Sequence, residues 1–358
     1  MPSSKDVIAT PETPAPLLHR AARIEDALHR MRARWGRRRG LTATIVPFVG
    51  YGSTTWVRVL CRVQLVRPPR KGARASVNVR GWRSFVGIPL GNATVTVTVG
   101  RVSREVLADR GGVVDVLINV KLSPGWHEIS ITAEGSEPVI APVFIVDPSV
   151  RFGLVSDIDD TVMVTALPRP FLAAWNTFVL NEHARRPVPG MAVLYERLKR
   201  EHPGAPVIYL STGAWNVAPT LNRFLERNLY PQGALLLTDW GPTHDRWFRS
   251  GQEHKRNALR RLATEFPDID WLLVGDDGQH DPELYRDFAH ESPSNVAGVA
   301  IRQLSTSEAV LAGGRNNEGP RSTPGVEWFY APDGAGIAEQ LSEADILPPD
   351  TFPKYKSH

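Results

Sequence analysis

Acidic and hydroxyl side chains gather directly after hydrophobic runs in the C-terminal half of the sequence. They are Asp157-Ile158-Asp159-Asp160-Thr161, Ser211-Thr212-Gly213, and Asp276-Asp277 with Asp281. Two carboxylates two residues apart, such as Asp157 and Asp159, can divide nucleophilic attack and proton transfer between them. A hydroxyl beside backbone N–H groups can hold a phosphoryl oxygen. The pattern favours chemistry on a phosphate ester.

Charge compensation at such a site would come from a lysine and a metal ion. Lys255 opens the predicted helix HKRNALRRLATEF after a loop rich in Gly and His, and its ammonium can neutralise a phosphate. The acids after WLLVG suit a hard divalent cation, and Mg²⁺ prefers oxygen ligands at about 2.1 Å. Calcium is disfavoured because Gly278 comes too early for the calcium-binding EF-hand loop. We therefore expect Mg²⁺ at this site.

The elements that must position these side chains are strands of a parallel sheet. Unbroken apolar runs between helical segments indicate strands covered on both faces, and they occupy residues 152–156, 205–211, 234–238, 271–275 and 296–301. Alone, the acids after the first strand are as typical of a solvated turn, Ser211-Thr212-Gly213 is more typical of a turn and helix cap, and Lys255 is indistinguishable from a solvated lysine. Together they follow successive strands in order, where the crevice of an open α/β sheet binds its ligand.

A different period precedes this half. Residues 54–66, 93–100, 113–122 and 126–134 alternate apolar with polar side chains, which predicts an antiparallel β-sandwich of about seven strands. Trp56, Trp82 and Trp126 are candidate core or corner residues, and Cys61 is expected to be a buried strand cysteine. The segment carries no clustered acids, so we expect a scaffold or recognition role.

The N-terminal arm is basic, with nine Lys or Arg against four Asp or Glu in residues 1–40. Residues 1–16 are expected to be a flexible tail, and residues 17–35 an amphipathic helix whose polar face is rich in arginine. Residues 17–39 suit either an anionic membrane surface or packing on the protein itself. Nucleic acid is not expected, since no motif accompanies the basic run.

Composition places the chain among globular proteins, with 42% hydrophobic and 22% charged residues. The sequence offers neither a run of 18 apolar residues nor a secretory signal pattern, so a cytoplasmic location is expected, with peripheral contact at the inner membrane surface through the basic helix. We expect three segments: the tail and basic helix (1–40), the sandwich-like domain (41–148) and the α/β domain (149–358).

The four motifs resemble those of the haloacid-dehalogenase superfamily. More narrowly, DIDDTV, YLSTGAWN, HKRNALRRL and GDDGQHDPELY are similar to the catalytic domain of the actin-patch-associated phosphatidate phosphatase family, and RPVPGMAVLYERL resembles that family's linker helix. The resemblance implies a multi-domain chain in which the β-sandwich precedes a haloacid-dehalogenase-like, doubly wound parallel sheet. The 45 or so residues after Thr161 leave room for only a small cap.

The resemblance also implies roles for individual residues. Asp157 would be the nucleophile and a Mg²⁺ ligand, and Asp159 the general acid and base, offering its backbone carbonyl to the metal. Phosphate binding would fall to Lys255 and to the hydroxyl group of residues Ser211, Thr212 and Thr161. Asp276 would ligate the metal, and Asp281 would support it directly or through water.

Two departures from the family pattern affect these roles. Gly213 stands where relatives often carry a hydroxyl, which bears on substrate contacts, and Asp277 adds a charge beside the expected metal. Whether Asp277 or Asp281 contacts the metal directly is left open by the sequence.

The expected reaction is hydrolysis of a phosphate monoester through an aspartyl-phosphate. The resemblance points to phosphatidate, and the apolar residues Phe171, Trp175 and Phe178 suit either a lipid or a helix core. Two alternatives stay open at this point. One is a phosphatase of soluble sugar or nucleotide phosphates, and the other is a non-catalytic adaptor acting through the β domain.

Overall fold

The computed structural model describes residues 31, 34–68, 87–164, 186–238, 244–278, 280–311 and 323–349, with the backbone alone at 244–250 and 311. The chain divides into two compact units, residues 1–145 and 146–358. Among the described residues, no helix combines the length and the apolar character needed to cross a membrane. Most of the expected basic helix lies outside the described part. Residues 34–38 are helical, and the side chains of Met31 and Trp35 are exposed.

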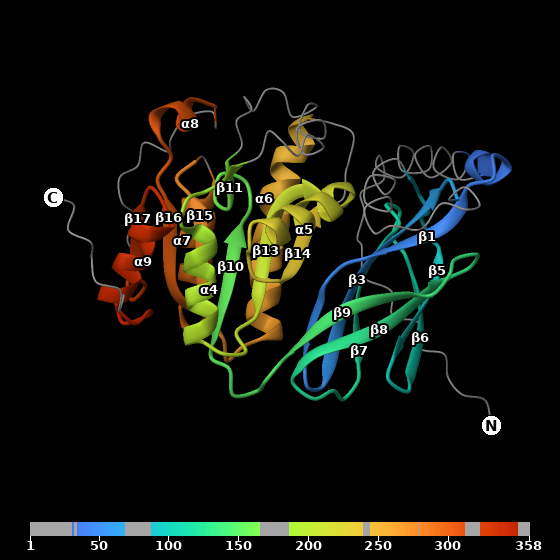
Figure 1. Cartoon of the computed structure of the whole chain (residues 1–358), viewed down its shortest axis with the longest axis horizontal. Coiled ribbons are helices and arrows are strands. Elements are labelled where there is room, and N and C mark those ends of the chain that lie inside the picture. Colours follow the sequence, from blue (N-terminus) through green and yellow to red (C-terminus); the bar gives the residue numbers. More distant parts are fainter. Residues whose placement is uncertain are drawn as a thin grey trace. The chain divides into compact units, whose positions relative to one another are not determined.

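The first unit is built from antiparallel strands. Within the described residues they form one nine-stranded sheet in the order β1-β3-β2-β9-β8-β5-β6, with β4 and β7 also pairing with β3 (Figure 1). The strands are β1 (Thr42–Pro47), β2 (Gly50–Ser53), β3 (Trp56–Val66), β4 (Ile88–Pro89), β5 (Thr94–Val99), β6 (Val102–Leu107), β7 (Val113–Asn119), β8 (Gly125–Ala133) and β9 (Val139–Val146).

Alternating side chains from these strands make the core of the first unit. Val57, Val59 and Cys61 of β3 and their counterparts on β5, β8 and β9 are buried, so the predicted burial of Cys61 is confirmed. Trp126, a candidate core residue, is not in the core: it is 45% exposed and packs against Phe144 on the outer face of β8 and β9. Its position follows from the alternation, since residues 126 and 128 face away from the buried residues 129 and 131. Trp82 lies outside the described residues.

The second unit contains a parallel sheet. Its strands are β10 (Phe152–Asp157), β13 (Val207–Ala214), β14 (Ala234–Thr238), β15 (Asp270–Asp276), β16 (Val296–Arg302) and β17 (Trp328–Ala331), in the order β14-β13-β10-β15-β16-β17. Every register between neighbours is parallel. All five predicted strands are present, and β17 is an addition to the prediction. The first strand of this unit, β10, lies at the centre of the sheet, and later strands are added on both sides of it. The carboxyl ends of β10, β13 and β15 therefore lie beside one another.

Helices cover this sheet on both faces, as the complete burial of β10 and β14 requires. They are α4 (Met191–Glu201), α5 (Ala218–Arg227), α6 (His244–Glu265), α7 (Asp281–Glu291), α8 (Thr306–Leu311) and α9 (Gly334–Glu343), with short 3₁₀ turns η3 (Trp215–Val217) and η4 (Pro293–Asn295). In Figure 1, α4 lies beside α9, and α6 packs with α7. Segment β11 (Met163–Val164) pairs with β12 (Arg186–Pro187); the expected cap with Phe171, Trp175 and Phe178 lies between them, outside the described residues.

The prediction for the helix that carries Lys255 was wrong at its start. We expected a loop up to residue 253, but α6 begins at His244, so Lys255 lies in the middle of the helix. Gly251 falls in the segment that was expected to be a loop, whereas it lies inside α6 at a tight contact. A Cβ at this position would lie 3.0 Å from Cγ2 of Thr212, so the glycine allows α6 to approach the end of β13.

Candidate active site at the carboxyl edge of the parallel sheet

Asp157 is the last residue of β10, and its carboxylate is 3% exposed. The backbone around it is fixed from α4: the Oγ of Ser156 donates to the carbonyl of Asp157 at 2.6 Å and lies 2.6 Å from the hydroxyl of Tyr195. The loop that follows turns sharply at Asp160, whose φ is 59°. Its N–H donates to the carbonyl of Met163 at 2.8 Å, which closes the turn. The nucleophile candidate is therefore held by a buried framework.

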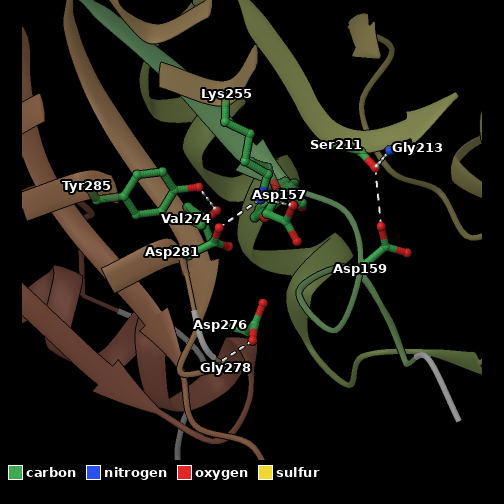
Figure 2. Close-up of polar contacts among 12 residues, drawn as sticks. Asp157, Asp159, Ser211, Gly213, Lys255, Val274, Asp276, Gly278, Asp281 and Tyr285 are labelled. Atoms are coloured by element: carbon green, nitrogen blue, oxygen red, sulfur yellow. Dashed lines mark hydrogen bonds and ion pairs between the residues drawn. The ribbon is translucent and has the colours of Figure 1, made fainter. Parts of the chain in front are cut away.

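Lys255 reaches the same place from α6 and joins two carboxylates. Its Nζ donates to Oδ1 of Asp157 at 2.6 Å and to Oδ1 of Asp281 at 2.7 Å, and the side chain is almost fully buried (Figure 2). Burial lowers the pKa of Lys255, but the charges of Asp157 and Asp281 raise it by more, so the ammonium stays charged. An ammonium has three N–H donors, and these two contacts use two of them.

Asp276 and Asp281 come from the end of β15 and the first residue of α7. Oδ1 of Asp276 accepts from the N–H of Gly278 at 2.7 Å. Asp281 approaches the strand closely at Gly275, where a Cβ would lie 2.6 Å from Oδ2 of Asp281. Glycine at this position is thus required for the carboxylate to reach the strand end.

Three carboxylates converge in one buried cluster. Ligand oxygens of Asp157, Asp276 and Asp281 all lie within 4.8 Å of one another. Burial raises the pKa of Asp157 well above its usual range despite the opposing effect of Lys255, and burial together with Asp281 and Asp160 does the same to Asp276. With all three carboxylates ionised, the cluster and the ammonium carry a formal charge of minus two, which one divalent cation would neutralise.

The cluster also contains a carboxylate oxygen that is available to ligate a cation. Oδ2 of Asp281 is buried and has no hydrogen-bond partner among the described residues. A buried carboxylate oxygen without a donor is unfavourable unless a cation or water meets it. Oxygen-only donors of this kind fit Mg²⁺. The residues present are therefore suited to hold the expected metal.

Asp159 lies on the other side of Asp157 in Figure 2, next to Ser211. The Oγ of Ser211 donates to Oδ2 of Asp159 at 3.2 Å and accepts from the N–H of Gly213 at 3.0 Å. Thr212 is partly exposed, and its carbonyl accepts from Oγ1 of Thr238 at 2.9 Å. The structure thus brings the end of β13 to the acid after β10, although the side chain of Asp159 is outside the carboxylate cluster.

Thr161 and Asp277 differ in what they contact. The hydroxyl of Thr161 is buried without a hydrogen-bond partner in the described part of the chain, beside the nucleophile loop. Asp277 turns away from the cluster, because its Oδ1 accepts from the N–H of Leu304 at 2.8 Å. Of the two acids whose metal contact the sequence left open, Asp281 is the one that joins Asp157 and Asp276.

Sequence reasoning missed two residues that support this site. Tyr195 braces Ser156 from within the predicted linker helix, and Arg302 closes the predicted strand at 296–301. Arg302 could have been found, because it directly follows a buried run, as Asp157 and Asp276 do. Tyr195 carried no signal, since an apolar-faced helix gives no indication of which hydroxyl a strand will meet.

Comparisons with known proteins identify the same part of the chain. Residues 152–303 match the family model described as the catalytic domain of phosphatidate phosphatase APP1. Over 158 residues the chain is 27% identical to phosphatidate phosphatase APP1 of Saccharomyces cerevisiae, a match covering 43% of this chain and 26% of that protein. Over 152 residues it is 24% identical to an uncharacterized protein of Schizosaccharomyces pombe, covering 42% of this chain and 25% of that one. The chain thus spans about a quarter of the length of these curated relatives.

A solved structure, that of a carbohydrate acetylesterase from Xanthomonas citri, matches over 74% of this chain and 70% of its own, with 12% identity and a TM-score of 0.27. A score this low establishes no shared fold. The family match is more informative, because it contains the whole cluster around Asp157, Lys255 and Asp276. The part of the chain that is similar to the phosphatidate phosphatase APP1 catalytic domain, residues 152–303, is therefore the part that carries the acidic cluster.

Proposed function

We propose that this protein is a Mg²⁺-dependent phosphatase that hydrolyses phosphate monoesters through an aspartyl-phosphate on Asp157. The observation that carries the proposal is the cluster of Asp157, Asp276 and Asp281 around Lys255, at the carboxyl ends of β10 and β15. The family match supports a phosphatase, and the buried acidic cluster supports a metal.

Asp157, Asp276 and Asp281 would hold the ion, together with the backbone carbonyl of Asp159. When bound, Mg²⁺ would supply positive charge against which the negative charge of a transferring phosphoryl group can develop. Lys255 supplies the same kind of stabilisation from the protein, because its buried ammonium stays charged and has a third N–H donor.

In the first step, a carboxylate oxygen of Asp157 attacks phosphorus as the bond between phosphorus and the ester oxygen breaks. Asp159 gives its proton to the departing oxygen, so an alcohol leaves. In the second step, Asp159 takes a proton from water, and the water oxygen displaces Asp157 from phosphorus. The products are inorganic phosphate and the regenerated Asp157 carboxylate.

Ser211 connects these two acids to the phosphate. Its hydroxyl donates to Asp159 and accepts from Gly213. For Ser211 to hold a phosphoryl oxygen, its donor must transfer from Asp159 to the substrate. This exchange would release Asp159 toward the leaving group, so substrate binding and proton transfer would be linked through one hydroxyl. Thr161 and Thr212 are proposed to complete the phosphate contacts.

The substrate that we favour is phosphatidate or a related lipid phosphate monoester, hydrolysed to diacylglycerol and phosphate. This choice rests on the similarity to the phosphatidate phosphatase of Saccharomyces cerevisiae. We also propose that residues 17–39 bind an anionic membrane surface. The protein would then lie on the cytoplasmic side of that membrane. A soluble sugar or nucleotide phosphate is the second candidate, because the partly exposed Thr212 at the end of β13 does not demand an apolar ligand.

The fold assignments belong to the same proposal. The parallel order with β10 at its centre supports a haloacid-dehalogenase-like, doubly wound domain over residues 149–358. The antiparallel pairing and the enclosed core of β3, β5, β8 and β9 support a sandwich over residues 41–148.

The test is a phosphate-release panel with phosphatidate vesicles, lysophosphatidate and soluble esters, with Mg²⁺ or with EDTA. We expect Mg²⁺-dependent release that Asp157→Asn lowers at least about 10³-fold, because the amide is a poor nucleophile. Asp287→Asn, on the surface of α7, is the matched control and should keep wild-type activity.

The panel separates the candidates. Release from phosphatidate vesicles above that from soluble esters supports the lipid substrate, and the reverse order supports the soluble one. Absence of release from every ester would reject the enzymatic proposal and favour an adaptor that acts through the β domain.

A further inference from the structure

Arg302 is a buried arginine at the end of β16, only 5% exposed. Its guanidinium makes three contacts to three different segments. Nη1 donates to the carbonyl of Asp160 at 2.7 Å, Nη2 to Oε1 of Glu308 at 2.7 Å, and Nε to the carbonyl of Pro332 at 3.2 Å. Asp160 and Pro332 lie 142 and 30 residues away in sequence, whereas Glu308 lies 6 residues away. The side chain therefore links the loop after β10 to α8 and to the residue that follows β17.

The backbone of Arg302 holds the second acidic loop. Its carbonyl accepts from the N–H of Asp277 at 2.9 Å, and Asp277 in turn accepts from the N–H of Leu304 two residues further on. Asp276 pairs with Arg302 in the register of β15 and β16. One residue thus binds the Asp276 loop through its main chain and the Asp157 loop through its guanidinium.

The contact to Asp160 lies at the sharp turn of the loop. Asp160 has a φ of 59°, a conformation that costs a non-glycine residue about 1 kcal/mol or more. A charged donor on the Asp160 carbonyl favours this turn, and charge-assisted hydrogen bonds are among the stronger ones in proteins. Lysine could not replace the guanidinium, because a single ammonium lacks the fixed fork that spans three acceptors.

We infer that Arg302 is a positioning residue that sets the distance between the Asp157 and Asp276 loops and so completes the cation site. Glu308 fixes the guanidinium from α8. In this role Arg302 acts through the two loops that it contacts, and we assign it no contact with substrate or metal. The inference rests on the proposed function for its metal, but its first test does not depend on metal or activity.

The first test is hydrogen exchange of the metal-free full-length protein, read by mass spectrometry on peptides covering residues 157–164. Arg302→Met should raise their exchange rate about 10-fold, while peptides of β13 (207–214) keep wild-type protection. Arg302→Lys, which retains the charge, should give an intermediate rate and serves if the methionine variant does not fold. Arg260→Met removes an exposed ion pair with Glu291 on the same unit and is the matched control.

The second test is Mg²⁺ affinity by calorimetry on the same proteins. Loss of a residue that orients metal ligands typically weakens binding about 10- to 100-fold, and we expect this range for Arg302→Met. With activity in hand, kcat should fall further than KM rises. A merely structural role would instead lower protection throughout the unit and leave the affinity of the folded fraction unchanged.

The outcomes separate this inference from the proposed function. Faster exchange at 157–164 with no Mg²⁺ binding in the wild type would keep the loop-fastening role and reject the metal site. Wild-type exchange rates in both Arg302 variants would overturn the inference, whether or not the protein hydrolyses phosphate. Unchanged Mg²⁺ affinity beside faster exchange would reject the link from loop to metal.

Discussion

The surroundings of Asp276 disfavour the ionised form of its carboxyl group in the metal-free protein. Burial raises the pKa of its carboxyl, and the charges of Asp281 and Asp160 raise it further, while Lys255 and the N–H of Gly278 act in the opposite direction. A divalent cation would reverse this balance, because it becomes the largest charge in the site. The acids that would bind the metal are therefore a source of instability without it.

Replacing this carboxylate should stabilise the metal-free protein. Asp276→Asn keeps an acceptor for Gly278 but removes the buried charge, so we expect a gain of about 1 kcal/mol at pH 7.5, or about 2–4 °C in the melting temperature of the second unit. The variant should also lose the stabilisation that the wild type gains from Mg²⁺. Calorimetric melts with EDTA and with Mg²⁺ measure both effects.

The pH dependence of these melts has a defined sign. In the unfolded chain the carboxyl titrates near its ordinary pKa of about 3.9, and in the folded protein the pKa is raised. Between the two values the folded state binds more protons, so the stability of the metal-free wild type falls as pH rises through that window. Asp276→Asn should show a smaller decline. An equal decline in both proteins, or a variant that melts lower at pH 7.5, would contradict the charge argument.

At the level of residues, the sequence was informative where a rule of the fold applied. Asp157, Ser211 and Asp276 were found because they directly follow buried runs, and strand ends meet at one edge. The contacts of Tyr195 to Ser156 and of Arg302 to Asp160 were not predictable, because they join segments 39 and 142 residues apart. The pairing of Ser211 with Asp159 likewise depends on which strands become neighbours.

At the level of elements, periodicity located strands better than it located helix starts. The run 234–238 coincides with β14, and the other predicted strands agree with the structure to within a few residues. The start of α6 was wrong because Gly251 resembles a breaker in sequence, whereas packing against Thr212 makes it favourable. The short β17 (Trp328–Ala331) gives too brief a pattern to separate from a turn.

The end of α5 offers a test of a local backbone cost. Leu229 follows the helix with a φ of 60° and is 80% exposed, so it has the left-handed conformation without compensating burial. Leu229→Gly should stabilise the protein by about 0.5–1 kcal/mol, because glycine adopts this conformation without strain. Chemical denaturation monitored by circular dichroism measures the change in unfolding free energy.

Gly190 supplies the opposite control at the start of α4. Its φ is 72°, and a Cβ there would lie 2.9 Å from the backbone nitrogen of Ala335. Gly190→Ala should therefore destabilise the protein, while Leu229→Gly stabilises it. If Leu229→Gly lowers the unfolding free energy, then the leucine makes a contact that outweighs its backbone strain.

At the level of the whole molecule, the two units have separate interiors. The core of residues 1–145 is formed by its own strands, and the acidic cluster belongs entirely to residues 146–358. Mg²⁺ binding should then stabilise one unit alone, because a ligand shifts only the unfolding equilibrium that destroys its site.

Cys61 is a natural reporter for this prediction, since it is the single cysteine and lies in the core of the first unit. Burial raises the pKa of its thiol to about 12, so a thiol reagent at pH 8 reacts once the first unit opens. In moderate urea, Mg²⁺ should raise the midpoint of the second unit's transition yet leave the labelling rate of Cys61 unchanged. Slower labelling with Mg²⁺ in the wild type, absent in Asp276→Asn, would mean instead that the units open together. In that case the β domain would sense the state of the metal site, and its role would extend beyond a scaffold.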